Sequence, residues 1–279
     1  MTRTASALRK AALACTAVVL TATATQAQAA PSATAAVQLP PTPAVLDYQL
    51  GAAYTPPSGV TLVTRDSTAT PAPGIYNICY VNGFQTQPEE KDLWLKDRKD
   101  LLLKDSGGNP IIDPDWPDEF ILDTSTATKR TRLADITGTV IQRCSQKGFK
   151  AVEIDNLDSY SRSRGKLTAS NNLAYATLLA TKAHALGLAI GQKNSAEESA
   201  RARSEVGFDF AFSEECHAYD ECSMYSDVYG THVMDVEYTD NLRGTFTNVC
   251  RDPQTPKTTT LRDRYLVGPG NSAYRYQHC

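Results

Sequence analysis

The sequence lacks the features that several classes of protein need. It has only four histidines, which form no ligand cluster, and no two cysteines follow the C-x₂-C spacing of zinc sites. It also has no phosphate-binding loop and no Ser/His/Asp arrangement. With 28 Lys+Arg against 31 Asp+Glu, the chain lacks the excess of positive charge that nucleic-acid binding requires. These absences argue against a zinc enzyme and against a nucleic-acid partner.

Long apolar runs are scarce as well. Three positive residues near the N-terminus precede an Ala-rich apolar run at 11–22, and an A-x-A cleavage site follows at 27–29. A membrane-spanning helix needs ~20 apolar residues, so this run is too short. We expect residues 1–30 to be a secretory signal peptide, with a retained anchor as the alternative. The mature protein is then expected to be a secreted, extracellular monomer without membrane contact.

Cysteine usage is consistent with an oxidising compartment. One of the seven cysteines lies in the predicted signal peptide, and the other six are Cys79, Cys144, Cys216, Cys222, Cys250 and Cys279. An even count in an exported chain predicts three disulfides, for which fifteen pairings are possible. Cys216 and Cys222 are close enough in sequence to staple one loop. Buried free thiols are the alternative.

The remaining chain reads as a leader and one domain. Residues 31–44 are rich in Pro, Ala, Ser and Thr and predict a flexible leader. Residues 45–279 contain no long linker, charge block or short-period repeat, and their length fits a single domain.

Within this domain, short apolar runs alternate with amphipathic stretches, a pattern typical of βα units. The predicted strands are Val45–Tyr48, Ile75–Val81, Glu119–Leu122, Ala151–Asp155, Leu188–Gly191, Asp209–Ser213, Val233–Glu237 and Thr260–Val267. The clearest predicted helices are Arg132–Gln146, Asn172–Leu186 and Glu197–Val206, followed by Gly148, Gly187 and Gly207 as left-handed C-terminal caps. Eight strands favour an α/β fold with a single (β/α)8 TIM-type barrel stabilised by disulfides. An open doubly wound sheet is the alternative.

Acidic residues follow many of these strands. In a (β/α)8 barrel, functional residues gather at the C-terminal ends of the strands. Asp123 and Asp158 have helix capping as an alternative role, because Asp is a favoured cap. Glu214 and Asp155 fit capping less well, since Glu is not a favoured cap and Asp155 closes an apolar run. Paired carboxylates without a metal cluster indicate acid–base or carboxylate-nucleophile chemistry, and glycoside hydrolysis needs such a pair.

Aromatic residues near the strand ends suggest a sugar substrate. Several of the 13 tyrosines, including Tyr48, Tyr80 and Tyr160, lie at or just after predicted strand ends. Aromatic faces can stack on the apolar side of sugar rings while tyrosine hydroxyls bond sugar hydroxyls. Ordinary rim packing is the alternative for any single tyrosine.

Five segments resemble one known family. They are DYQLGAAYTPP (47–57), YNICYVNGFQTQP (76–88), GFKAVEIDNLDSY (148–160), GLAIGQKN (187–194) and FDFAFSEEC (208–216). Together they resemble glycoside hydrolase family 114, the endo-α-1,4-polygalactosaminidases, over essentially the whole mature chain. The resemblance implies a barrel that cleaves α-1,4-linked galactosamine polymers without a metal or organic cofactor.

The resemblance also implies the catalytic residues. An Asp after the fourth strand acts as nucleophile and a Glu after the sixth as acid/base, which here are Asp155 and Glu214. Glu215 is adjacent, and only one of the two glutamates can face the barrel mouth, because neighbouring strand residues point to opposite faces. A retaining route predicts carboxylates ~5–5.5 Å apart, whereas an inverting route predicts ~6.5–9.5 Å.

Further residues are candidates for substrate binding. They are Asp47, Tyr48, Tyr80, Asn82, Asp158, Tyr160, Lys193, Asn194, Glu215 and Glu237. The extra carboxylates suit an amine-bearing polysaccharide, and Lys193 is expected to lower the pKa of a neighbouring carboxylate. The alternatives from other classes are a sugar-binding barrel without catalysis and a metal-dependent barrel hydrolase.

Overall fold

The computed structural model describes residues 1–2 and 37–279, so the predicted signal peptide lies almost wholly outside the described residues, as does the start of the predicted leader. Residues 37–44 of that leader contact the folded domain. The Tyr76 hydroxyl donates to the Gln38 carbonyl at 2.6 Å, and Ala44 is buried. In the described part of the chain, no helix combines the length and apolar character that crossing a membrane requires.

Nine strands form one sheet in chain order. They are β1(Leu46–Gln49), β2(Leu62–Asp66), β3(Tyr76–Asn82), β4(Ala151–Asp155), β5(Ala189–Lys193), β6(Phe210–Glu214), β7(Val233–Tyr238), β8(Thr260–Arg262) and β9(Tyr276–His278). Strands β1 to β8 are parallel to their neighbours, and β9 pairs antiparallel with β8. The fold is the expected (β/α)8 barrel, nearly closed.

Side chains bridge the gap between β8 and β1. The guanidinium of the buried Arg262 donates to Asp47 Oδ1 at 2.9 Å and also to the Tyr48 carbonyl. From β9, the Tyr276 hydroxyl donates to the Leu46 carbonyl at 3.1 Å. These contacts satisfy polar groups that a continuous backbone ladder would otherwise pair.

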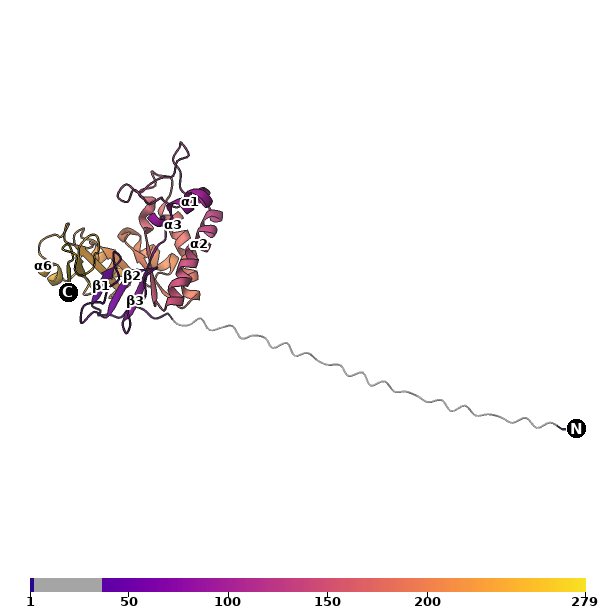
Figure 1. The fold of residues 1–279 in the computed structure, drawn as a ribbon, viewed down its shortest axis with the longest axis horizontal. Coiled ribbons are helices and arrows are strands. Elements are labelled where there is room, and N and C mark those ends of the chain that lie inside the picture. Colours follow the sequence, from indigo (N-terminus) through magenta and orange to yellow (C-terminus); the bar gives the residue numbers. More distant parts are fainter. Residues whose placement is uncertain (3–36) are drawn as a thin grey trace. The chain divides into compact units, whose positions relative to one another are not determined.

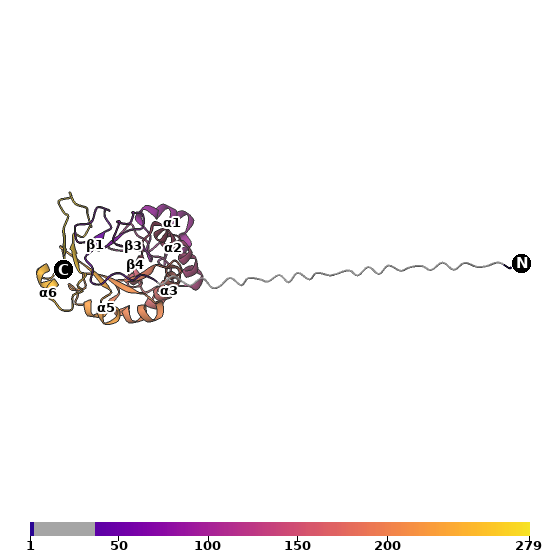
Figure 2. The same ribbon diagram turned by 90° about the horizontal axis from the view of Figure 1, so that it is seen from below.

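The helices cover the barrel unevenly. They are α1(Lys91–Asp97), α2(Ala127–Lys147), α3(Ala169–Ala185), α4(Ser199–Arg201), α5(Cys222–Tyr229) and α6(Phe246–Arg251), with short turns η1(Pro88–Glu90), η2(Lys99–Leu101), η3(Leu157–Tyr160), η4(Ala196–Glu198) and η5(Ala202–Val206). The fully described connections 50–61 and 67–75, on either side of β2, contain no helix. Figures 1 and 2 show α2 and α3 on one flank of the sheet, while the C-terminal segment lies beside β1.

Helix ends follow the sequence signals. The Thr126 side chain accepts the amide of Lys129 to begin α2, and Thr168 with Asn171 forms a capping box that begins α3. Gly148, Gly187 and Gly207 all have positive φ, as predicted. At these three positions, glycine adopts the left-handed backbone conformation that leads from a helix into the next strand at the least steric cost.

Alternation along the strands divides the core into two layers. Leu46, Ile78, Phe210, Phe212 and Met234 belong to the cluster inside the barrel. The alternate strand residues pack instead against α2, α3 and α5 in a larger outer cluster. Because successive residues point to opposite faces, this division fixes which polar residues at the strand ends face inward.

Some predicted elements differ from the structure. The prediction of a strand at Glu119–Leu122 was wrong, because this segment makes only isolated antiparallel bridges to the loop after β3. The second barrel strand is instead Leu62–Asp66, whose Arg and Asp side chains obscure the apolar signal. The predicted strand Thr260–Val267 ends at Arg262, and β9 was not predicted.

Three disulfides connect the described cysteines. Cys79 in β3 bonds Cys144 in α2, which fixes a long helix to the barrel wall. Cys216–Cys222 staples the loop after β6, as anticipated, and Cys250–Cys279 ties the C-terminus to α6. The free-thiol alternative is therefore wrong for all six cysteines.

Candidate active site

Three adjacent strands deliver charged side chains to the barrel mouth. Asp155 ends β4, Lys193 ends β5 and Glu214 ends β6. Glu214 follows Phe210 and Phe212 in steps of two, so its side chain lies on the inner face. Glu215 follows the end of the strand and pairs with Arg264 instead of Lys193.

The backbone reverses sharply after each of these strands. Asn156, Asn194 and Glu215 have φ values of 66°, 52° and 62°. Left-handed conformations at non-glycine residues cost ~1–3 kcal/mol and cluster at active sites and ligand clamps. Three of them around one barrel mouth therefore indicate a site whose geometry is held against local strain.

Lys193 is the centre of this arrangement. Its buried ammonium lies 3.4 Å from Asp155 Oδ1, 3.2 Å from Glu214 Oε2 and 3.1 Å from Glu153 Oε1. Burial alone would lower the pKa of Lys193, but the three carboxylates outweigh it and raise that pKa. Lys193 therefore carries a permanent positive charge between the acids.

The two carboxylates at the mouth are close together. Since both touch one ammonium, Asp155 Oδ1 and Glu214 Oε2 are no farther apart than the sum of those two contacts. This upper limit on the carboxylate separation falls at the lower edge of the ~6.5–9.5 Å found in inverting glycosidases. It also allows the ~5–5.5 Å separation of retaining ones.

Hydrogen bonds orient Asp155. The Tyr80 hydroxyl donates to Oδ2 at 2.5 Å, and the backbone amide of Asn156 donates to Oδ1 at 2.9 Å. Burial raises the pKa of Tyr80, as does the charge of Asp155, so the phenol stays a neutral donor. The carboxylate is fixed by these donors while its side chain keeps 17% of its surface exposed.

Glu214 is held in a similar way from the opposite side. Tyr238 donates to Oε1 at 2.5 Å, and Asn194 Nδ2 donates to Oε2 at 3.0 Å. Burial would raise the pKa of Glu214, but Lys193 and these donors lower it below its ordinary value. Near neutral pH, this glutamate is therefore ionised in the free enzyme.

Glu153 lies one layer below, inside the barrel. It is fully buried, and its Oε1 accepts from the Tyr48 hydroxyl at 2.9 Å, while Oε2 has no hydrogen-bond partner among the described residues. Burial raises the pKa of Glu153 to about 7, against the opposing effect of Lys193. This buried carboxyl can therefore exchange a proton near neutrality.

A cleft of about 990 Å³ opens over Asp155, Lys193 and Glu214. Among the predicted site residues, it is lined by Tyr48, Tyr80, Asn82, Asp155, Asp158, Lys193, Asn194 and Glu214. Asn82 donates to Glu119 Oε2 at 2.9 Å, and Asp158 pairs with Arg162 at 2.6 Å. The structure thus brings eight of the predicted residues to one cleft that holds a close pair of carboxylates.

Comparison with known proteins identifies the family of the chain. The model of glycoside-hydrolase family GH114 matches residues 25–279. The chain belongs to glycoside-hydrolase family GH114. No curated protein sequence gives a significant match.

Solved structures support the fold of this GH114 protein. A structure of Ega3 from Aspergillus fumigatus, in complex with galactosamine, is 22% identical with a TM-score of 0.66, over 88% of this chain and 99% of that one. The glycoside hydrolase domain of PelA from Pseudomonas aeruginosa is 14% identical with a TM-score of 0.53, over 82% of this chain and 98% of the other. At these identities, the likeness establishes the shared fold.

The remaining predicted residues of the GH114 chain lie outside the cleft lining. Asp47 is in the buried pair with Arg262, and the Tyr160 hydroxyl donates to Glu197 at 2.7 Å. Glu215 pairs with Arg264 at 2.8 Å, and Glu237 accepts the backbone amide of His217 at 2.8 Å. All four support the strand ends around the site. Asp47 and Glu237 are one residue out of phase with the inward-facing positions of their strands, whereas Tyr160 and Glu215 lie beyond the ends of theirs.

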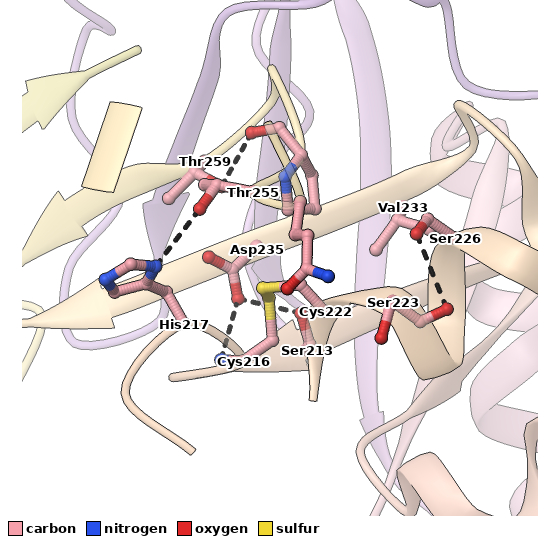
Figure 3. The surroundings of a disulfide bond; sticks show 12 residues. Ser213, Cys216, His217, Cys222, Ser223, Ser226, Val233, Asp235, Thr255 and Thr259 are labelled. Atoms are coloured by element: carbon pink, nitrogen blue, oxygen red, sulfur yellow. Dashed lines mark hydrogen bonds between the residues drawn. A yellow bond between two sulfur atoms is a disulfide. The ribbon is translucent and has the colours of Figure 1, made fainter. Parts of the chain in front are cut away.

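A second group of potential ligands lies on the outer side of β7. Cys216, Asp235 and Glu237 place ligand atoms within 4.8 Å of one another. However, Cys216 is bonded to Cys222, and Asp235 Oδ1 accepts from Ser213 at 2.7 Å (Figure 3). A disulfide sulfur is not the thiolate that binds metals. At the main site, the ammonium of Lys193 occupies the place between carboxylates that a cation would take.

Several residues of the cleft escaped the sequence analysis. Arg162, Glu119, Arg264 and Trp116 lie in loops without a recognisable motif, and the sequence analysis also missed Glu153, which is buried below the cleft. For Glu153 a signal existed, because it is two residues before Asp155 and therefore shares its face.

Proposed function

We propose that this chain is a secreted hydrolase that cleaves α-1,4-linked polymers of galactosamine and N-acetylgalactosamine at internal bonds, with retention of configuration. The observation that carries the proposal is the close pair Asp155 and Glu214, joined through Lys193 at the mouth of the barrel. Galactosamine bound to the similar Ega3 structure supports the sugar class. Three disulfides and the predicted signal peptide support secretion.

The charge of the cleft favours an amino sugar. Nine carboxylates line it against five Lys and Arg side chains. An ammonium group on the sugar gains Coulomb energy in such a cleft, most where water is partly excluded. Acetylated units, which are neutral, would rely more on stacking and hydrogen bonds, so a partly deacetylated polymer is the best first substrate.

The reaction would proceed by double displacement. Asp155 attacks the anomeric carbon and forms a glycosyl ester, while the bond to the leaving sugar breaks and Glu214 gives its proton to the departing oxygen. Water then attacks the same carbon, Glu214 accepts the proton from that water, and the ester bond to Asp155 breaks. Both carboxyl groups return to their starting states.

The acid step places a demand on Glu214. Because Lys193 and two neutral donors lower the pKa of Glu214, the carboxyl must take up a proton before it can act. We expect kcat/KM to fall as the pH rises through the lowered pKa of Glu214, which gives an optimum on the acid side of neutrality. The pH profile of kcat/KM reports this ionisation in the free enzyme.

The test is digestion of partly deacetylated α-1,4-galactosaminogalactan by the purified protein, with mass spectrometry of the products. We expect a ladder of short oligomers that Asp155→Asn and Glu214→Gln each abolish while circular dichroism shows an intact fold. Glu215→Gln should retain far more activity, because its side chain lies outside the cleft. Loss of activity in Glu215→Gln but not in Glu214→Gln would overturn the acid/base assignment.

A negative result would be equally informative. No products from the folded protein, across several degrees of acetylation, would reject the substrate class and leave the barrel and its carboxylate pair to another glycan.

A further inference from the structure

Two large aromatic side chains at the cleft stand out by their exposure. Trp116 is 53% exposed and Tyr265 is 74% exposed, and both line the cleft that holds Asp155 and Glu214. The other tryptophan, Trp94, is 3% exposed. Aromatic faces left open to solvent in a polar cleft are suited to stacking on the apolar faces of sugar rings.

The turn that carries Trp116 is firmly anchored. Buried Asp113 accepts the backbone amides of Asp115 at 2.8 Å and Trp116 at 3.3 Å through Oδ1. Its other oxygen, Oδ2, lies 2.7 Å from Arg162 Nε. The tryptophan is therefore attached to a defined backbone turn, although its ring is open to solvent.

Arg162 connects this turn to the nucleophile candidate. Its guanidinium donates to Asp158 at 2.6 and 2.9 Å and to Asn156 Oδ1 at 3.0 Å. The amide of Asn156 in turn donates to Asp155. A continuous set of charged and polar contacts thus runs from the Trp116 turn to Asp155.

The turn that carries Tyr265 is held in strain. The next residue, Leu266, has a φ of 52°, which is costly for a non-glycine residue. A Cβ at Gly51 would lie 2.3 Å from the Tyr265 carbonyl oxygen, so the two backbones are in close contact. Asp263 accepts the amide of Val267 at 3.0 Å and closes the turn.

A second arginine connects this turn to the acid/base candidate. Arg264 pairs with Glu215 at 2.8 Å and with Asp240 at 2.9 Å. Its guanidinium carbon lies 4.1 Å from the centroid of the Tyr238 ring, whose hydroxyl donates to Glu214. Each exposed aromatic residue is therefore tied through one arginine to one of the two carboxylates.

Chain order places the two aromatic residues on different sides of the reacting pair. Trp116 lies in the connection after β3, which pairs with β4 and Asp155, whereas Tyr265 follows β8, which pairs with β7, the neighbour of β6 and Glu214. We propose that Trp116 and Tyr265 are stacking platforms for two sugar subsites on opposite sides of the cleaved bond. This inference rests on the proposed function and extends it to the internal units of the polysaccharide.

The first measurement is kcat/KM for reducing-end-labelled α-1,4-galactosamine oligomers of increasing length. Loss of a stacking contact should lower kcat/KM for long oligomers about 10-fold, while the shortest cleavable oligomer is hardly affected. Trp116→Ala and Tyr265→Ala should move the preferred cleavage position in opposite directions along the oligomer. Trp116→Phe and Tyr265→Phe keep a ring and should restore most of the effect.

The second measurement separates this inference from the proposed function. In inactive Glu214→Gln, oligomers should change tryptophan fluorescence, because Trp116 is the more exposed of only two tryptophans, and Trp116→Phe should abolish the change. Unchanged length profiles and fluorescence in an enzyme that cleaves the oligomers would overturn the platforms alone. If the wild-type protein cleaves no galactosamine oligomer and shows no fluorescence change, both proposals fail.

Discussion

Two groups of carboxylates lie only a strand or two apart, and they differ in the charge of their partners. Glu153, Asp155 and Glu214 surround the ammonium of Lys193 inside the barrel. Asp235 and Glu237, on the outer face of β7, accept hydrogen bonds from neutral donors: Ser213 and the amide of Cys216 for Asp235, and the amide of His217 for Glu237. In each of the latter two, one oxygen has no hydrogen-bond partner among the described residues.

The charge states follow from this difference. Burial raises the pKa of Asp235 to about 6 and, with the charge of Asp235, that of Glu237 to about 8. Burial acts on Glu214 in the same direction, yet Lys193 reverses the result. Without a cationic partner, burial thus raises the pKa values of Asp235 and Glu237, whereas Lys193 keeps Glu214 ionised near neutral pH.

The largest expected effect tests whether only the carboxylates around Lys193 take part in catalysis. Glu214→Gln should lower kcat on a galactosamine polymer by about 1,000-fold or more, because a positioned general acid alone contributes ~10²–10⁴-fold. Glu237→Gln removes a more deeply buried glutamate on the other face and should stay within a few-fold of wild type. Steady-state kinetics of the two purified variants compares them. Comparable losses in both would show that the outer group takes part in catalysis.

The next effect sharpens the role of Lys193. Lys193→Met removes the charge that lowers the pKa of Glu214, so this pKa should rise and the basic limb of kcat/KM should move to higher pH. Activity should fall as well, since Asp155 loses the ammonium that contacts its Oδ1 at 3.4 Å. Combining Lys193→Met with Glu153→Gln removes one buried acid together with the cation. A basic limb that does not move in either variant would mean that Lys193 has only a structural role.

Much of the inner group could be predicted from the sequence. Asp155, Lys193 and Glu214 end apolar runs at the expected spacing, and the corresponding strands β4, β5 and β6 lie close to their predicted ranges. Local alternation identifies the end of each strand, because the apolar pattern stops there. The resemblance to GH114 selected the same residues.

The face on which each acid lies could not be predicted. Asp47 and Glu237 also end predicted strands, but they point away from the barrel interior, where Tyr48 and Tyr238 take the inward positions. Which face is inward depends on how distant strands close the barrel, and no local pattern contains that information. Residues from long loops, such as Arg162 and Trp116, reach the cleft through contacts that are equally non-local.

The smallest expected effect concerns stability rather than turnover. Glu237 has a higher pKa in the folded protein than its ordinary value of 4.5, so the folded state binds a proton more tightly than the unfolded chain does. Its contribution to stability is therefore fully present below about pH 4.5 and is lost as the pH rises toward about 8. Glu237→Gln, which cannot ionise, should remove part of this loss and raise the free energy of unfolding at pH 8 relative to wild type by ~1–2 kcal/mol, with little gain at pH 4. Urea unfolding of both proteins at the two pH values measures this difference in the free energy of unfolding.

The control is Glu205→Gln. Glu205 lies on the exposed η5 turn and has a lowered pKa, so this variant should be neutral or slightly destabilising at pH 8. Equal effects of Glu237→Gln at both pH values would show that folding does not raise the pKa of Glu237, which would remove the contrast between the two acidic groups.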